Sequence, residues 1–171
     1  MIDKMLNIYE TIRCYKGSKK WEYIIIHHSQ TKDRITADWE AIRRWHTGQI
    51  PGSPYKWDDI GYHFGLESVN EVLTYQIGRS LDIFGAHCRG RNHDGLGICL
   101  IGSYDDNAPT HEQYFAMSSL CRYLMEKFDI PIHNVLGHRS FSEKSCPGEL
   151  FNIVKLRNYI KGEISKYSIS S

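Results

Sequence analysis

The stretch EYIIIHH, from Glu22 to His28, restricts the fold more than any other feature of the sequence. It is a continuous apolar run rich in β-branched residues, which is the pattern of a strand buried on both faces. A strand with one solvated face would instead alternate polar and apolar residues. The run therefore predicts a sheet that is covered on both sides by other elements, as in α/β proteins.

Further segments with strand and helix patterns are mixed along the chain. Strands are predicted over 60–67, 72–78, 96–102 and 134–138, and helices over 36–48, 110–128 and 153–164. The helix over 110–128 has the clearest signal, because Thr110 and Gln113 form a capping box before an apolar stripe. We predict a single α/β domain over residues 21–171, with a mixed central β-sheet flanked by helices. Residues 1–20 are predicted to form a polar lead-in with one helical turn.

Composition and charge exclude several classes of protein. The 171 residues are 41% hydrophobic and 24% charged, with a formal net charge of +1, so neither disorder nor a basic nucleic-acid footprint is indicated. No segment approaches the roughly 20 apolar residues of a membrane helix, and the first residues lack the apolar core of a Sec signal. We expect synthesis in the cytoplasm, where an odd count of five cysteines argues against a disulfide framework.

Metal-competent side chains follow two of the predicted strands. His27 ends the first strand, His138 ends the strand over 134–138, and Cys146 lies in the polar loop beyond it. Ligand sites in open α/β sheets gather at strand ends. Two imidazoles and one thiolate suit Zn²⁺ and leave a fourth position open for water. The residues alone do not choose between His27 and His28, since both faces of that strand are apolar.

Two other patterns bear on this candidate site: one would add a cation to it, and the other is a competing cluster of possible metal ligands. Lys144 precedes Cys146 by two positions, so in an extended loop its ammonium would project beside the thiolate and could stabilise an oxyanion. His87, Cys88 and His93 form a second cluster in HCRGRNH. Its spacing fits no common structural zinc pattern, and a substrate-groove loop is the favoured interpretation.

Four stretches, in this order, resemble the zinc-dependent N-acetylmuramoyl-L-alanine amidases: IIIHHSQTK, IGYHF, GAHCRGRNHDGLGICLIG and LGHRSFSEKSCP. This type-2 amidase group includes phage endolysins and peptidoglycan recognition proteins. The resemblance spans roughly residues 23–147, which leaves out the first twenty residues and the tail. Lys144 matches the phage-lysozyme branch, at a position where the animal recognition proteins usually differ.

The resemblance implies roles for particular residues. Zn²⁺ would be bound by His27, His138 and Cys146, and the catalytic residues would be Tyr62 and Lys144. The groove for substrate would be lined by the residues of the GAHxxGxN pattern, His87, Gly90 and Asn92. Gly95 stands where a serine is common in the family, so a hydroxyl contact at that position is in question.

The resemblance also implies the reaction, which is hydrolysis of the amide between the lactyl group of N-acetylmuramic acid and L-alanine of the stem peptide. The expected partner is peptidoglycan or a muropeptide, bound by a monomer that contacts neither nucleic acid nor membrane. The enzyme would reach the wall after holin-mediated lysis or dedicated export, or act on wall fragments in the cytoplasm.

Two alternatives share the expected fold: a peptidoglycan-binding module, and a regulator that inhibits RNA polymerase. Binding-only relatives commonly lack a metal ligand, so the presence of Cys146 favours an enzyme. A muramidase would need paired carboxylates beside a sugar cleft. Glu40, Glu67 and Glu71 offer no clear pair.

Overall fold

The computed structural model describes residues 2–31, 38–69 and 72–162, in which five strands form one mixed sheet. The strands are β1 (Tyr23–His28), β2 (Phe64–Val69), β3 (Val72–Ile77), β4 (Gly95–Leu100) and β5 (Val135–Gly137), in the order β3-β2-β4-β1-β5. β1 runs parallel to β4 and β5, and β2 runs parallel to β4 and antiparallel to β3. The predicted mixed α/β sheet is confirmed.

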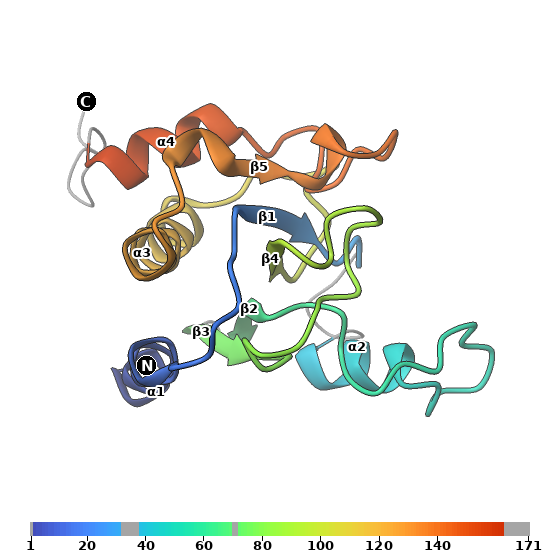
Figure 1. The fold of residues 1–171 in the computed structure, drawn as a ribbon. Helices are drawn as coiled ribbons and strands as arrows, with labels where there is room; N and C mark the ends of the chain where they lie inside the picture. Colours follow the sequence, from blue (N-terminus) through green and yellow to red (C-terminus); the bar gives the residue numbers. More distant parts are fainter. Residues whose placement is uncertain (1, 32–37, 70–71, 163–171) are drawn as a thin grey trace.

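Helices cover both faces of this sheet. They are α1 (Ile2–Cys14), α2 (Trp39–His46), α3 (His111–Phe128) and α4 (Ile153–Lys161), with short 3-10 helices η1 (Ile132–Asn134) and η2 (His138–Ser140). α1 and α3 lie on one side of the sheet with α4 packed on α3, and α2 lies on the other side (Figure 1). Among the described residues, none of these helices has both the length and the apolar character to cross a bilayer.

β1 is buried on both faces, as its sequence predicted. Ile24, Ile25 and Ile26 are fully buried, and Ile24 and Ile26 belong to the large core beneath α1, α3 and α4. Because successive side chains of a strand point to opposite faces, His27 lies on the face of Ile25, towards α2. His28 lies on the opposite face, where its Nδ1 accepts a hydrogen bond from the backbone amide of Tyr104 at 3.2 Å.

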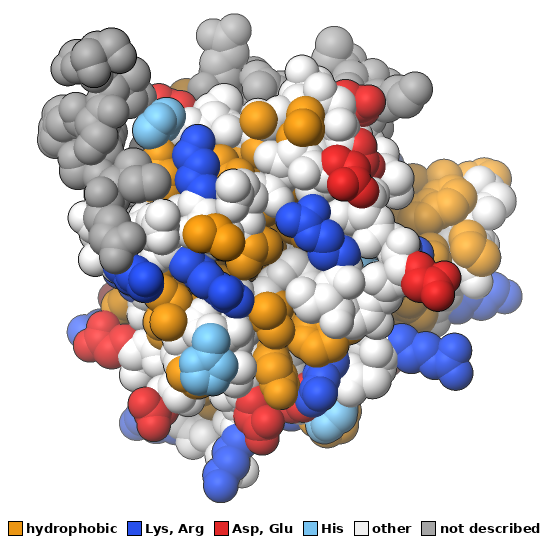
Figure 2. Space-filling view, turned by 90° about the horizontal axis from the view of Figure 1, so that it is seen from above, with side chains coloured by type: hydrophobic (Ala, Val, Ile, Leu, Met, Phe, Trp, Pro, Cys, Tyr) orange, Lys and Arg blue, Asp and Glu red, His pale blue; other side chains and the backbone are white. Residues whose placement is uncertain are grey.

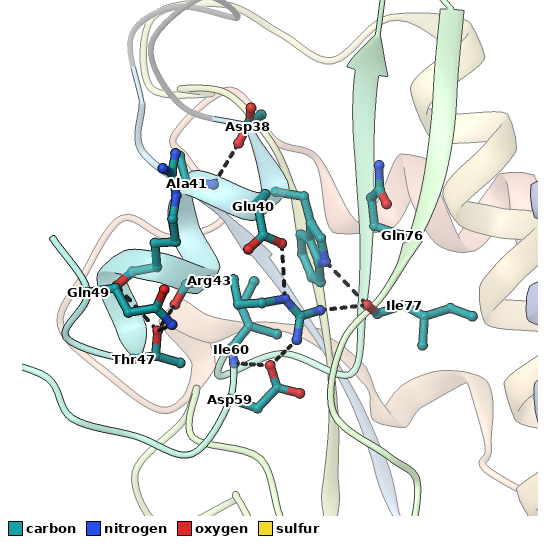
Figure 3. Close-up of polar contacts among 12 residues, drawn as sticks. Asp38, Glu40, Ala41, Arg43, Thr47, Gln49, Asp59, Ile60, Gln76 and Ile77 are labelled. Atoms are coloured by element: carbon teal, nitrogen blue, oxygen red, sulfur yellow. Dashed lines mark hydrogen bonds and ion pairs between the residues drawn. The ribbon is translucent and has the colours of Figure 1, made fainter.

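α2 is fixed to the edge of the sheet by a polar network around Arg43 (Figure 3). The Arg43 guanidinium binds the carboxylates of Glu40 and Asp59 and donates to the carbonyl of Ile77 at 3.1 Å. The indole of Trp39 donates to the same carbonyl at 3.3 Å. This network holds one wall of the site described below.

The ends of α2 differ in part from the sequence prediction. The predicted cap, Thr36, lies outside the described residues, and the carboxylate of Asp38 accepts from the amide of Ala41 at 2.6 Å instead. At the other end Thr47 is the C-cap and Gly48 follows with φ +74. A glycine is favoured there because only residues without a Cβ enter this region without strain.

The face seen from above in Figure 1, which carries α4 and β5, has mixed charge. Figure 2 shows Lys and Arg side chains interspersed with Asp, Glu and hydrophobic side chains on this face. Nucleic-acid binding generally uses a continuous basic surface. The described residues visible in this view do not form one.

The prediction of a single helical turn within residues 1–20 is wrong. α1 is 13 residues long, and Ile8 and Ile12 are buried in the main core. These two residues are four positions apart, so they occupy one face of a helix, which contacts β3 and α3. The sequence carries apolar residues at helical spacing here, at Met5, Ile8 and Ile12, and this signal was not used in the prediction. The contact with β3 and α3 shows that Ile8 and Ile12 are core residues.

Replacing Ile12 by alanine should lower the free energy of unfolding by about 2–5 kcal/mol, because the substitution leaves a cavity in a fully packed site. Urea denaturation followed by circular dichroism measures this change. Glu10→Ala is the matched control on the same helix, where the side chain is 68% exposed. If the two variants were equally stable, packing of α1 against the core would not contribute to stability.

Candidate metal centre and catalytic site

Three potential metal ligands from distant parts of the chain converge at one end of the sheet. One ligand atom each from His27, His138 and Cys146 lies within 4.8 Å of the others, and His27 Nδ1 is 3.6 Å from Cys146 Sγ. Zinc bonds of about 2.0–2.3 Å place tetrahedral ligands roughly 3.3–3.8 Å apart. The donor types therefore fit one zinc ion, and so does the distance between His27 Nδ1 and Cys146 Sγ.

The parallel pairing of β1 with β5 explains why the two histidines meet. Ile26 is in register with Gly137, so the carboxyl ends of both strands lie at the same edge of the sheet. His27 follows Ile26, and His138 follows Gly137 as the first residue of η2. The rings of the two histidines are 4.6 Å apart between centroids.

The loop that carries Cys146 is irregular but firmly braced. The guanidinium of Arg139 donates to the carbonyls of Gly148 and Phe151, each at 2.7 Å. From the opposite side, the carboxylate of Asp105 accepts from the hydroxyl of Ser145 at 3.1 Å and from the amide of Glu149 at 2.9 Å. These bonds fix the loop on both sides of the thiol.

Burial sets the protonation of the three ligands. It lowers the pKa of His27 well below its ordinary value, and the neighbouring His87 adds to this effect. Burial also lowers the pKa of His138, followed by the charge of Lys144, and it raises the pKa of the Cys146 thiol to about 11. At neutral pH the imidazoles therefore keep a lone pair for a metal, whereas the thiol must lose its proton when a cation binds.

A cavity of about 490 Å³ opens beside the three ligands. One wall is aromatic, and comes from the end of α2 and the following loop: Trp45, His46, Tyr55 and Trp57. The rings of Tyr55 and Trp57 are 4.5 Å apart, and that of His46 lies 4.8 Å from Trp57. A mostly apolar cleft with a few convergent polar groups is typical of a substrate site.

Tyr62 lies in this cavity beside the ligands. Its ring centroid is 5.1 Å from that of His27, and its side chain lines the cavity. Burial raises the pKa of Tyr62 well above 10, and Cys99 and Cys146 raise it further. The phenol therefore remains protonated at neutral pH and is able to donate a hydrogen bond into the cavity.

Lys144 is exposed and lines the same cavity. Its charge is close enough to contribute, after burial, to the lowered pKa of His138. The predicted placement of an ammonium beside the thiol is therefore consistent with the geometry.

The residues expected to line the substrate groove divide into two groups. His87 lines the cavity, where its Nδ1 lies 3.0 Å from Nε2 of His27. Asn92 is absent from the described cavity lining, and its Oδ1 accepts from the amides of His87 and Cys88, each at 2.8 Å. Gly90 is exposed at a turn with φ +83. Asn92 thus shapes the loop that presents His87.

The departure at Gly95 has a steric reason. A Cβ added at Gly95 would lie 2.7 Å from both the carbonyl of Arg91 and the Cδ1 of Ile25. Contacts this short do not occur for real side chains without a shift of the backbone. The close approach of β4 to Ile25 therefore excludes the serine hydroxyl.

The competing cluster at residues 87–93 does not form a metal site. The side chain of His93 is 62% exposed and lies 3.6 Å from the carboxylate of Asp94, whereas His87 faces His27. Among residues 2–31, 38–69 and 72–162, His27, His138 and Cys146 are the group whose ligand atoms converge.

The glutamates considered as a carboxylate pair for a muramidase have structural partners where they are described. Glu67 accepts from the amide of Trp39 at 3.1 Å and from the side chain of Gln76 at 2.7 Å. Glu40 pairs with Arg43, and Glu71 lies outside the described residues. Neither described carboxylate lines the cavity beside the ligands.

The aromatic wall and the buried His63 were not predicted from the sequence. His46 accepts from the amide of Gly61 at 3.1 Å, and burial lowers its pKa to about 4. His63 accepts from the amide of Gly97 at 3.1 Å, and burial lowers its pKa to about 4 as well. The available signal was the pair of aromatic residues Tyr55 and Trp57, which lie between the predicted helix over 36–48 and the predicted strand over 60–67.

Comparison with known proteins identifies the family to which the chain is related. A family model described as N-acetylmuramoyl-L-alanine amidase matches residues 17–149. The chain is 30% identical to the endolysin of Escherichia phage T7 over 138 residues, which are 78% of this chain and 84% of that protein. It is also 30% identical over 156 residues to an N-acetylmuramoyl-L-alanine amidase of Sus scrofa, covering 82% of this chain and 25% of that protein.

Solved structures show the same fold. The endolysin amidase LysCS from Clostridium intestinale URNW matches with a TM-score of 0.70 and 24% identity, over 86% of both chains. Drosophila PGRP-LB matches with a TM-score of 0.62 and 26% identity, over 90% of this chain and 85% of that one. Since the family match covers all five strands of the sheet and the whole candidate site, this chain belongs to the N-acetylmuramoyl-L-alanine amidase family.

Proposed function

We propose that this protein is a zinc-dependent amidase that cleaves the bond between the lactyl group of N-acetylmuramic acid and L-alanine of the peptidoglycan stem peptide. The observation that carries the proposal is the convergence of His27, His138 and Cys146 beside a cavity that also contains Tyr62 and Lys144. When bound by these ligands, zinc supplies a Lewis acid and lowers the pKa of a coordinated water.

The other residues of the cavity have complementary tasks in this proposal. Lys144 donates from its ammonium to the oxygen of the lactyl carbonyl as negative charge develops there. Tyr62, which is protonated at neutral pH, donates a hydrogen bond that orients the attacking water. As the C–N bond breaks, the nitrogen of L-alanine takes up the proton that the attacking water gives up, and the amine leaves as the new N-terminus of the peptide.

The aromatic wall supports a large amphipathic substrate. Trp45 and Trp57 present ring surfaces to the cavity, while the ligands and Lys144 occupy its polar side. A sugar–peptide conjugate has both kinds of surface. A Drosophila PGRP-LB variant whose structure is similar to this one, at 27% identity, was solved in complex with tracheal cytotoxin.

The site of action follows from the substrate. We propose that the enzyme meets intact wall after lysis or dedicated export, or acts on muropeptides inside the cell. The phage relatives with which it aligns are named endolysins, which supports the first route.

Product chemistry on purified peptidoglycan tests the proposal. We expect new free alanine amino groups without new reducing sugar ends, loss of this activity with a chelator, and its return with zinc. Metal analysis of the active protein should give about one zinc per chain. New reducing ends would instead indicate a glycosidase, and peptidoglycan binding without any cleavage would indicate a binding module.

A further inference from the structure

His87 connects the backbone of β4 to one of the proposed metal ligands through two hydrogen bonds. Its Nε2 lies 3.1 Å from the carbonyl oxygen of Gly95, and its Nδ1 lies 3.0 Å from Nε2 of His27. On the far side of the His27 ring, Nδ1 is 3.6 Å from the Cys146 sulfur. The three groups form a continuous chain from a fixed carbonyl to the metal-ligand set.

The carbonyl of Gly95 determines which nitrogen donates in each of these hydrogen bonds. A carbonyl oxygen only accepts, so His87 Nε2 must carry hydrogen and donate to Gly95. In a neutral imidazole the second nitrogen then has a lone pair, and Nδ1 of His87 accepts from Nε2–H of His27. This leaves Nδ1 of His27 unprotonated, on the side that faces Cys146.

The surroundings of His87 hold its ring in this position. An added Cβ at Gly97 would lie 2.6 Å from Cδ2 of His87, and one at Gly85 would overlap the same ring. The backbone amides of His87 and Cys88 both donate to Oδ1 of Asn92 at 2.8 Å. Close backbone contact on the ring and a clamp on its loop leave the imidazole little freedom to rotate.

We infer that His87 is a positioning residue of the metal centre, which fixes the tautomer and orientation of His27 so that Nδ1 is presented to the cation. This role differs from the substrate contact implied by the family resemblance, and it rests on the proposed function only for the presence of zinc. Partners that orient a ligating histidine typically contribute 10–100-fold in metal affinity.

Zinc affinity of purified variants tests the inference without an activity assay. His87→Ala removes the acceptor and should weaken zinc binding about 10–100-fold in competition with a chromophoric chelator. His87→Asn places an amide oxygen near the position of Nδ1 and should recover much of this loss. His93→Ala, in the same loop but exposed, is the matched control and should bind zinc like the wild type.

A spectroscopic measurement separates positioning from packing. Cobalt substituted for zinc should show an altered visible absorption in His87→Ala and a spectrum closer to wild type in His87→Asn. Equal losses of affinity in both variants would overturn the inference, because a packing role would not depend on the acceptor. Wild-type affinity in a folded His87→Ala protein would also overturn it and leave the proposed function intact, whereas a wild-type chain without zinc affinity would refute both.

Discussion

Cys146→Ser should abolish hydrolysis of peptidoglycan while the protein remains folded. Serine is nearly isosteric with cysteine, and Cys146 lies in a braced loop rather than among the residues of the main core. A serine hydroxyl is a far weaker zinc ligand than a thiolate, so two imidazoles alone would hold the ion. Release of free alanine amino groups, zinc content and thermal unfolding are the three measurements.

Cys88→Ser is the matched control for this experiment. Cys88 is also buried, but its sulfur contacts the carbonyl of Arg89 and lies outside the ligand set. We expect this variant to keep its zinc and most of its activity. A Cys146→Ser protein that cleaved peptidoglycan at a wild-type rate would show that the assigned metal centre is wrong.

Lys144→Ala should lower kcat by about 10²–10³, the cost of removing one donor to a developing oxyanion. Lys144 is an exposed side chain of the cavity and is not among the converging ligands, so the zinc content and the free energy of unfolding should stay at wild-type values. Steady-state kinetics on a soluble muropeptide separate kcat from KM, which turbidity assays of whole wall do not.

Two substitutions sharpen the result. Lys144→Arg keeps a cation and should retain part of the rate, and Glu143→Ala, an exposed neighbour in the same loop, should behave like the wild type. An increase in KM with unchanged kcat would contradict a role in the transition state, because it would show that Lys144 contributes equally to ground-state binding.

Local sequence patterns predicted much of the architecture. The unbroken apolar run of β1 predicted burial on both faces, and Thr110 with Gln113 predicted the start of α3, where the capping box is present. These signals are strong because they depend on residues within a few positions of one another. The sequence of α1 has apolar residues at helical spacing, but that Ile8 and Ile12 belong to the core follows only from their contact with distant elements.

The sequence by itself determined the mixed α/β sheet and the ligand candidates His27, His138 and Cys146, because strand patterns and residue chemistry are local properties. The residues alone left His27 and His28 open, and only the tertiary structure decided that His27 converges with His138 and Cys146, since that choice depends on which face of β1 meets α2. It also decided that Asn92 clamps a loop and that His87 reaches His27. Such contacts join residues far apart in the chain, and their geometry exists only once the sheet has formed.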